Sequence, residues 1–203
     1  GQNAVSAADS ETAFAMAKRR ISGEPIQYIL GHCPFMDLDF VVNPATLIPR
    51  PETELLVETV LELLPKGKPL TVWDIGCGSG CIGISLAHYN PDLSVVAIDL
   101  SGVALETTAL NAKRCGTDGR MTTLCLDIMK AMPDAKAPDV IVSNPPYIRH
   151  DVIDALQREV RNFEPLTALD GGADGLDFYR RIIADAPLQS GGLLAFEIGY
   201  DQG

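Results

Sequence analysis

The chain has 203 residues, of which 46% are hydrophobic and 21% charged, so it can bury the core of one main domain and is not a disordered tail. It carries 16 Lys and Arg against 27 Asp and Glu, a formal net charge of -11, and so lacks the basic excess by which proteins bind nucleic acid unaided. No apolar run reaches the roughly 20 residues needed to cross a bilayer and no secretion signal opens the sequence, so we expect a cytoplasmic monomer that binds neither nucleic acid nor membrane and suits a basic protein partner.

The N-terminal part of the sequence predicts two helices and a linker between them. Residues 8–22 have a helical pattern that ends at Gly23, and residues 26–42 have the pattern of an extended hairpin. The stretch PETELLVETVLELL begins with a proline suited to a first helical turn. We interpret three parts: a remnant of a small N-terminal helical domain (1–22), a β-hairpin linker (23–50) and the main domain (51–203).

Beyond the linker, short apolar runs alternate with helical patterns. The runs are bounded by Gly, Pro, Asn or Asp and lie at residues 70–76, 94–100, 120–127, 138–144 and 191–199. Helical patterns such as CIGISLAHY and GVALETTALNAKRC separate them. Buried strands that alternate with helices predict an α/β fold with a doubly wound, mostly parallel sheet, of the Rossmann-like kind. Ligands of such sheets bind beyond the carboxyl ends of the strands.

A glycine-rich turn, DIGCGSGCIG, follows the first of these strands and opens a helix. Its loop alternates glycine with small side chains: Gly76, Cys77, Gly78, Ser79 and Gly80. Such a loop lets the backbone approach a ligand where a Cβ would obstruct it. Asp99 ends the next strand, from which a carboxylate can accept hydrogen bonds from both ribose hydroxyls. A glycine turn alone could be purely structural, but together with Asp99 it predicts a nucleotide site.

The spacing of the glycines indicates which nucleotide binds. It is G-x-G-x-G, and Cys81 stands where the dinucleotide fingerprint has its third glycine. S-adenosylmethionine has no pyrophosphate to cradle, so this spacing favours it over NAD as the cofactor. Asp127, at the end of the third strand, is a candidate partner for the adenine amino group, and Ile128 for the adenine ring. The alternative for Asp127 is a helix N-cap.

The fourth strand ends in NPPY, and we predict that Asn144, Pro145, Pro146 and Tyr147 are catalytic, with Asn144 also touching the cofactor. The Asn144 side-chain oxygen and the Pro145 carbonyl can accept both hydrogens of a planar NH2, while the prolines fix the backbone that presents them. Tyr147 offers an aromatic face to a flat substrate group. An amide or exocyclic amine is a poor nucleophile, so the site would act by alignment and exclusion of water. A proline-rich turn is the structural alternative.

Other reactive side chains have simpler interpretations. The five cysteines form no C-x-x-C pair, which favours reduced thiols and predicts no metal site. His150 is expected to be an exposed loop residue, because an amide needs no deprotonation before it attacks a sulfonium. Arg50 is assigned to an ion pair with an acid such as Glu54, in preference to the cofactor carboxylate. Glu197 could face the site or act as a cap.

The glycine loop, Asp99 and NPPY together resemble class I methyltransferases that act on planar nitrogens, including amino-DNA methyltransferases. Further segments resemble the PrmC/HemK family of release-factor glutamine methyltransferases. They are GEPIQYILG (23–31), LIPRPETELLVE (47–58), FEPLTALDGGADGL (163–176) and GGLLAFEIG (191–199). The resemblance covers nearly the whole chain in the family's order. It differs in two places, because most of the family's N-terminal helical domain and its final strand pair are missing from the sequence.

This resemblance implies methyl transfer from S-adenosylmethionine to the side-chain amide nitrogen (N5) of the glutamine in the Gly-Gly-Gln motif of peptide-chain release factors. It also implies cofactor binding at Gly76 to Gly80 and Asp99, adenine contact at Ile128 and a substrate clamp at Asn144 to Tyr147. The alternatives are a glutamine methyltransferase acting on a ribosomal protein, an adenine-N6 nucleic-acid methyltransferase, and a noncatalytic S-adenosylmethionine-binding module.

Overall fold

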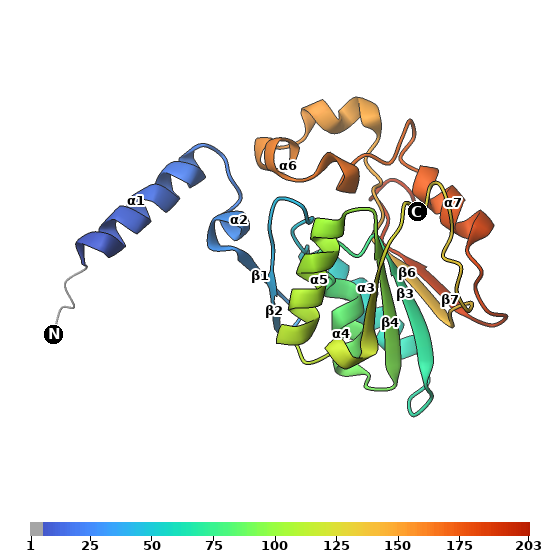
Figure 1. Ribbon diagram of the computed structural model, residues 1–203. Coiled ribbons are helices and arrows are strands. Elements are labelled where there is room, and N and C mark those ends of the chain that lie inside the picture. Colours follow the sequence, from blue (N-terminus) through green and yellow to red (C-terminus); the bar gives the residue numbers. More distant parts are fainter. Residues whose placement is uncertain (1–5) are drawn as a thin grey trace.

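A five-stranded parallel sheet forms the centre of the computed structural model, which describes residues 6–203 (Figure 1). Its strands are β3 (Leu70–Ile75), β4 (Leu93–Asp99), β5 (Met121–Cys125), β6 (Val140–Ser143) and β7 (Leu193–Phe196). Their order across the sheet is β5-β4-β3-β6-β7, and every neighbouring pair is parallel. The strand order reverses beside β3, which places a crevice between β3, β4 and β6 at their carboxyl ends.

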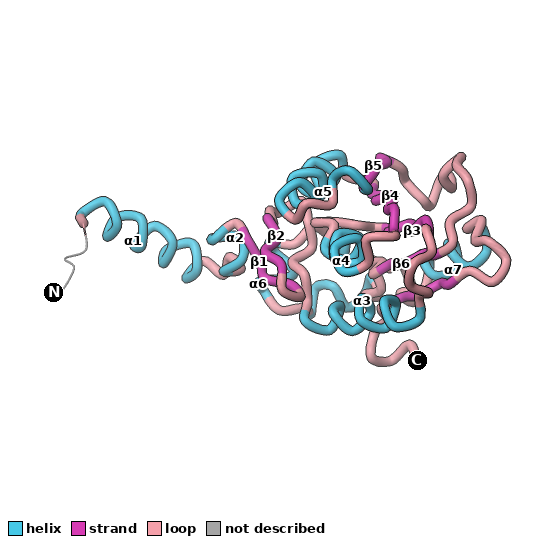
Figure 2. The backbone as a smooth tube through the Cα atoms, turned by 90° about the horizontal axis from the view of Figure 1, so that it is seen from below, coloured by secondary structure: helices cyan, strands magenta, loops and turns pink. Residues whose placement is uncertain are grey.

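Helices cover both faces of this sheet, which confirms the predicted doubly wound α/β fold. Figure 2 shows α3 (Pro51–Leu63), α4 (Cys81–Tyr89) and α5 (Gly102–Arg114) on one side and α7 (Asp177–Asp185) on the other. All four residues of β6 are buried, as are all residues of β3 except Thr71. Because both faces are covered, these strands read as continuous apolar runs in the sequence.

The core has two main parts, one on each face of the sheet. On the first face, the side chains of β3 and α4 pack with Val57 of α3 and with Phe35 and Phe40 of the hairpin. On the second face, the fully buried Trp73 and Ile141 pack against Ile182 of α7. These apolar layers hold the strand ends, and therefore the loops that follow them, in fixed positions.

The N-terminal part differs from the sequence prediction in one element. Helix α1 (Ala7–Ile21) agrees with the prediction and extends away from the sheet in Figure 1. The predicted extended segment begins instead with a short helix, α2 (Ile26–Leu30), and only then forms the hairpin β1 (His32–Phe35) and β2 (Leu38–Val41). Gly31 ends α2 in the left-handed region, at φ 80°, and its N–H donates to the Gln27 carbonyl at 2.7 Å. A single helical turn is too short for its periodicity to be told from that of a strand.

The segment between β6 and α7 is mostly turns and short helices. It contains two 3-10 helices (His150–Ala155 and Leu166–Ala168) and α6 (Arg158–Phe163), while a further 3-10 helix (Asp118–Arg120) precedes β5. A parallel bridge between Ile148 and Asp170 closes it into a loop beside the sheet. Among residues 6–203, no helix combines the length and apolarity needed to cross a membrane.

Candidate active site

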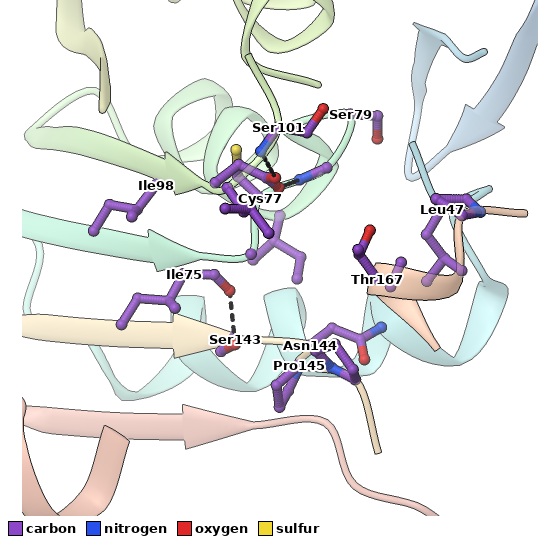
Figure 3. Close-up of a pocket in the computed structure, with 18 of the residues that line it drawn as sticks. Leu47, Ile75, Cys77, Ser79, Ile98, Ser101, Ser143, Asn144, Pro145 and Thr167 are labelled. Atoms are coloured by element: carbon purple, nitrogen blue, oxygen red, sulfur yellow. Dashed lines mark hydrogen bonds between the residues drawn. The ribbon is translucent and has the colours of Figure 1, made fainter. Parts of the chain in front are cut away.

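A pocket lies at the carboxyl ends of β3, β4, β5 and β6 (Figure 3). Each of these strands contributes the residues that follow it, and the linker and the segment after α6 complete the wall. The sequence-predicted residues that line it are Gly76, Cys77, Gly78, Ser79, Asp99, Asp127, Ile128, Asn144, Pro145 and Pro146. Figure 3 shows Asn144 and Pro145 across the pocket from Cys77, with Leu47 and Thr167 on a third side.

Two predicted residues do not line the pocket. Gly80 lies at the N-terminus of α4 with φ 81°, and a Cβ there would lie 2.8 Å from side-chain atoms of both Ile84 and Thr108. Its role is therefore to start the helix in a crowded place, since only glycine fits this conformation without strain. Tyr147 is half-buried behind the pocket wall, where its backbone carbonyl accepts a hydrogen bond from Gln202 Nε2 at 3.3 Å.

Asp99 connects β4 to the glycine loop. Its Oδ2 accepts the Gly78 N–H at 2.9 Å and its Oδ1 accepts the Ser101 N–H at 2.8 Å. Burial raises the pKa of this carboxyl, and the backbone N–H donors partly offset that effect. An ionised carboxylate has about four acceptor positions, so each oxygen keeps capacity for one more donor. This geometry fits a ligand that presents a pair of hydroxyls.

Asp127 lines the pocket, but it begins a turn and not a helix, so the helix N-cap alternative is wrong. Its Oδ1 accepts the Met129 N–H at 3.0 Å within this turn, and its Oδ2 pairs with Lys130 at 3.0 Å. The hydrogen bond from Lys130 lowers the pKa of the Asp127 carboxyl. The neighbouring Ile128 is buried and packs with Ile98 in the core beneath the pocket. The pair therefore offers a carboxylate and an apolar surface side by side.

The cysteines beside the glycine loop are packing residues. Cys77 and Cys81 are free and buried, and Cys77 Sγ lies 3.5 Å from the Thr108 hydroxyl. Burial raises the pKa of Cys77 above its ordinary value and that of Cys81 to about 12, so both thiols stay protonated and unreactive. Among residues 6–203, no group of three or more His, Cys, Asp or Glu side chains is placed to hold a metal ion.

The end of β6 holds the NPPY motif against β3. The Ser143 hydroxyl donates to the Ile75 carbonyl at 2.7 Å, which fixes the position of the next residue. Asn144 Nδ2 donates to the Thr53 hydroxyl at 3.3 Å. Asn144 Oδ1 is buried and has no hydrogen-bond partner within residues 6–203. A buried acceptor of this kind normally has a donor, so the arrangement fits a ligand N–H in the pocket.

Several pocket residues were not found by sequence reasoning. The linker supplies Leu47 and Pro49, the first turn of α3 supplies Thr53, and the segment after α6 supplies Pro165 and Thr167. None of these stretches carries a reactive side chain at a strand end, which is the signal that located the other residues. Their only sequence signal is that they lie in the segments LIPRPETELLVE (47–58) and FEPLTALDGGADGL (163–176).

The partner expected for Arg50 is wrong. Its guanidinium pairs with the buried carboxylate of Glu164, which also accepts the Ile48 N–H at 3.3 Å. Glu54 points to the hairpin instead, where it accepts the Met36 N–H at 2.6 Å. The Arg50 ion pair therefore joins the linker to the segment after α6, and Arg50 also lines the pocket.

His150 is an exposed residue, as predicted. Its side chain is 73% exposed and its Nδ1 lies 2.7 Å from Asp170 Oδ2. The Asp170 carboxylate raises the pKa of His150 above its ordinary value. His150 is not among the residues that line the pocket.

Solved structures support the fold assignment. The catalytic domain of hMettl16 in complex with the MAT2A 3'UTR hairpin 6 matches with a TM-score of 0.58 and 18% identity, covering 81% of this chain and 62% of that chain. Precorrin-6y C5,15-methyltransferase from Geobacter metallireducens matches with a TM-score of 0.50 and 18% identity, and the match covers 80% of this chain and 70% of that chain. At this level of identity, the likeness concerns the fold alone.

Sequence comparison identifies the family. Residues 51–162 match the family described as Methyltransferase small domain, and residues 1–31 match the PrmC N-terminal domain. A release factor glutamine methyltransferase of Moorella thermoacetica is 49% identical over 91% of this chain and 65% of its own length, and one of Clostridium botulinum is 42% identical over 96% and 70%. The chain thus spans about two thirds of the length of these curated relatives. It belongs to the family of release factor glutamine methyltransferases.

Proposed function

We propose that this protein transfers a methyl group from S-adenosylmethionine to the side-chain amide nitrogen of a glutamine in a peptide-chain release factor. The names of the relatives support the substrate class. The single structural observation that carries the proposal is the buried, unpartnered Asn144 Oδ1 in the wall of a pocket that also contains Asp99. A primary amide supplies the N–H donors that this acceptor needs.

The pocket residues fit the cofactor. Asp99 has free acceptor capacity for the ribose hydroxyls, and the loop at Gly76 and Gly78 lets the backbone come close to the ligand. Ile128 offers an apolar surface to the adenine ring, with Asp127 beside it for the amino group. S-adenosylmethionine, when bound, supplies a methyl on a sulfonium sulfur: as the nitrogen–carbon bond forms, the carbon–sulfur electron pair stays on sulfur and one N–H proton is lost to water.

The NPPY motif orients the nucleophile. Asn144 Oδ1 and the Pro145 carbonyl would each accept one hydrogen of the glutamine NH2, which fixes the plane of the amide and the direction of its nitrogen. The walls at Leu47 and Thr167 would exclude water from the approach to the methyl group. Alignment of this kind can account for several kcal/mol of a barrier, so no general base is required.

The main alternatives differ in substrate. An adenine-N6 nucleic-acid methyltransferase would use the same acceptors on an exocyclic NH2, but the net charge of -11 opposes binding to a polyanion. A ribosomal-protein glutamine would present the same amide, and the relatives' names favour the release factor over it. A release factor substrate would place the reaction in the cytoplasm. One copy of the chain suffices, because every group invoked comes from the same protomer.

The test is methylation of an intact release factor with labelled S-adenosylmethionine, followed by mass spectrometry of the glutamine-containing peptide. We expect one methyl group on that glutamine. The matched control is a release factor whose glutamine is replaced by asparagine, which should accept almost none. Transfer to both proteins alike would remove the glutamine from the proposal.

A further inference from the structure

Glu197 lies behind Asn144, on the side away from the pocket. It directly follows β7, its N–H donates to the Ser143 carbonyl at 3.1 Å, and its carbonyl accepts the Tyr179 hydroxyl at 2.8 Å. These two backbone contacts fix the residue between β6 and α7. Glu197 does not line the pocket, so its side chain has no direct access to cofactor or substrate.

The Glu197 carboxyl faces the NPPY motif. β6 and β7 pair in parallel with Ser143 opposite Phe196, so Asn144 and Glu197 follow as neighbours at the two strand ends. Interactions with Thr53, Asn144 and Tyr147 lower the pKa of the Glu197 carboxyl and so favour its ionised form. Its Oε2 is nevertheless buried without a hydrogen bond of standard geometry to any residue between 6 and 203. Glu197 is therefore a buried acceptor directly beside the amide that carries the proposed chemistry.

The orientation of the Asn144 amide decides whether it can serve the substrate. Rotation by half a turn would exchange its oxygen and nitrogen, and the pocket would then present a donor to the substrate NH2. An ionised carboxylate only accepts hydrogen bonds, so it attracts the Asn144 NH2 and repels Oδ1. In the structure the NH2 donates to the Thr53 hydroxyl and Oδ1 has no hydrogen-bond partner among residues 6–203, which is the orientation that a carboxylate at Glu197 favours.

We propose that Glu197 is a positioning residue: its carboxylate holds the Asn144 NH2, so that Asn144 Oδ1 faces the substrate amide. This inference rests on the proposed function for its effect on the rate, while the orientation itself can be measured without catalysis. It gives Glu197 a role distinct from the capping alternative, because a cap would not depend on the identity of residue 144.

The charges around Glu197 make the positioning sensitive to pH. Burial is the largest effect and raises the pKa of the Glu197 carboxyl; Glu52 of α3 raises it further, and the neighbouring donors Thr53, Asn144 and Tyr147 lower it. Tyr179 of α7 contacts the backbone carbonyl of Glu197. We expect kcat to fall as the pH is lowered and Glu197 gains a proton. The variant Glu197→Gln should not show this acid-side fall of kcat with pH.

An exchange of donor and acceptor tests the proposal most sharply. Glu197→Gln should lower kcat about ten- to a hundredfold and leave the KM for S-adenosylmethionine within about twofold. Asn144→Asp alone sets two carboxylates side by side and should be still less active. In the double variant Asn144→Asp/Glu197→Gln the donor lies at position 197 and the acceptor at position 144, so one donor again faces one acceptor. Its kcat should be about tenfold or more above that of Asn144→Asp. No recovery in the double variant would overturn the proposal.

Glu52→Gln is the matched control. Glu52 is exposed in the first turn of α3 and contributes to the charge around Glu197, so this variant removes the same charge nearby without touching Asn144. It should change kcat by less than about twofold. A loss as large as that of Glu197→Gln would mean that net charge, and not the contact with Asn144, sets the rate.

A second readout separates this inference from the proposed function. The side-chain NH2 of Asn144, identified in NMR spectra by its loss in Asn144→Asp, should exchange slowly with water in the wild type and faster in Glu197→Gln. Equal exchange in both would contradict the proposal even if methylation proceeds. If the wild type methylated no glutamine, the proposed function would fail, and slow exchange that depends on Glu197 would still support the positioning contact. Should Glu197→Gln not fold, Glu197→Asp, which withdraws the carboxylate by one carbon, must also speed the exchange of the Asn144 NH2 with water.

Discussion

Each oxygen of Asp99 accepts one backbone N–H, from Gly78 and from Ser101, so the carboxylate shapes the loop as well as offering acceptors to a ligand. We expect Asp99→Ala to weaken S-adenosylmethionine binding by about 1.5 to 3 kcal/mol, the range for hydrogen bonds to a charged group. Isothermal titration calorimetry measures this. Asp92→Ala is the control, because Asp92 also accepts a backbone N–H, from Gly67, and does not line the pocket. An unchanged affinity in Asp99→Ala would remove Asp99 from the cofactor site.

Asn144→Ala separates binding from chemistry. The variant removes the buried acceptor Oδ1, whereas the glycine loop and Asp99 remain. We expect kcat on a release factor to fall about a hundredfold or more while the affinity for S-adenosylmethionine changes much less. Single-turnover kinetics together with calorimetry give both values. Normal turnover would reduce NPPY to a turn that ends the strand.

Among individual residues, those with a polar side chain directly after a strand could be predicted from the sequence. Asp99 and Asn144 follow β4 and β6 and line the pocket, as predicted. Tyr147 is predicted in the same wall but does not line the pocket, whereas Thr53, which lies far from both in the chain, does. The direction of a side chain after two prolines depends on what packs around it, and no local pattern encodes that packing.

Between elements, Asp74 ties α4 to β3. Asp74 is fully buried, its Oδ2 accepts the Gly83 N–H at 2.9 Å, and a Cβ at Gly83 would lie 2.8 Å from that oxygen. Burial raises the pKa of Asp74 to about 7. In the unfolded chain this carboxyl ionises near the ordinary value, so the folded state holds a proton that the unfolded state releases. This contribution to the free energy of unfolding is therefore lost as pH rises from about 4 to about 7.

Asp74→Asn should remove this pH dependence, because an amide oxygen can still accept the Gly83 N–H and carries no charge. We expect the variant to be more stable than the wild type by about 1 to 4 kcal/mol at pH 8 and nearly equal to it at pH 4. Urea denaturation at both pH values measures the difference. A variant that is less stable at pH 8 would show that the ionised carboxylate contributes to the fold.

The Arg50 ion pair holds two segments together that both line the pocket. Because the Glu164 side chain is only 2% exposed, Arg50→Ala would leave a buried carboxylate without its partner. We expect a loss of about 1 to 3 kcal/mol in stability, less than for a fully buried pair because Arg50 itself is one-third exposed. Arg149→Ala is the control, since both partners in its pair with Asp151 are more than half exposed. Equal losses in chemical denaturation would contradict this assignment.

Among the elements, the long periodic ones were predictable and the short ones were not. The prediction for residues 51–64 matches α3, and the stretch CIGISLAHY is α4. The sequence predicts extended chain where the five residues of α2 form a helix, and it predicts a partner for Arg50 one helical turn away. The actual partner lies 114 positions along the chain, and nothing in local spacing identifies a contact of that range.

The whole molecule is acidic, with a formal charge of -11. Electrostatic repulsion should keep free DNA and RNA away from the pocket, while a basic surface on a protein substrate would be attracted. We expect DNA or RNA alone to accept almost no methyl from S-adenosylmethionine. Filter-binding assays with labelled cofactor measure this. Methyl groups in adenine would favour the nucleic-acid alternative.

The most direct test of the proposed glutamine methylation is to let a release factor and total RNA compete for the protein in one reaction and to identify which of them is methylated. Mass spectrometry of peptides and of nucleosides from the same mixture reads both products. We predict a single methyl group on the side-chain nitrogen of one release-factor glutamine, and we expect Asn144→Ala to abolish its formation. Methylated adenine with unmodified glutamine would contradict it.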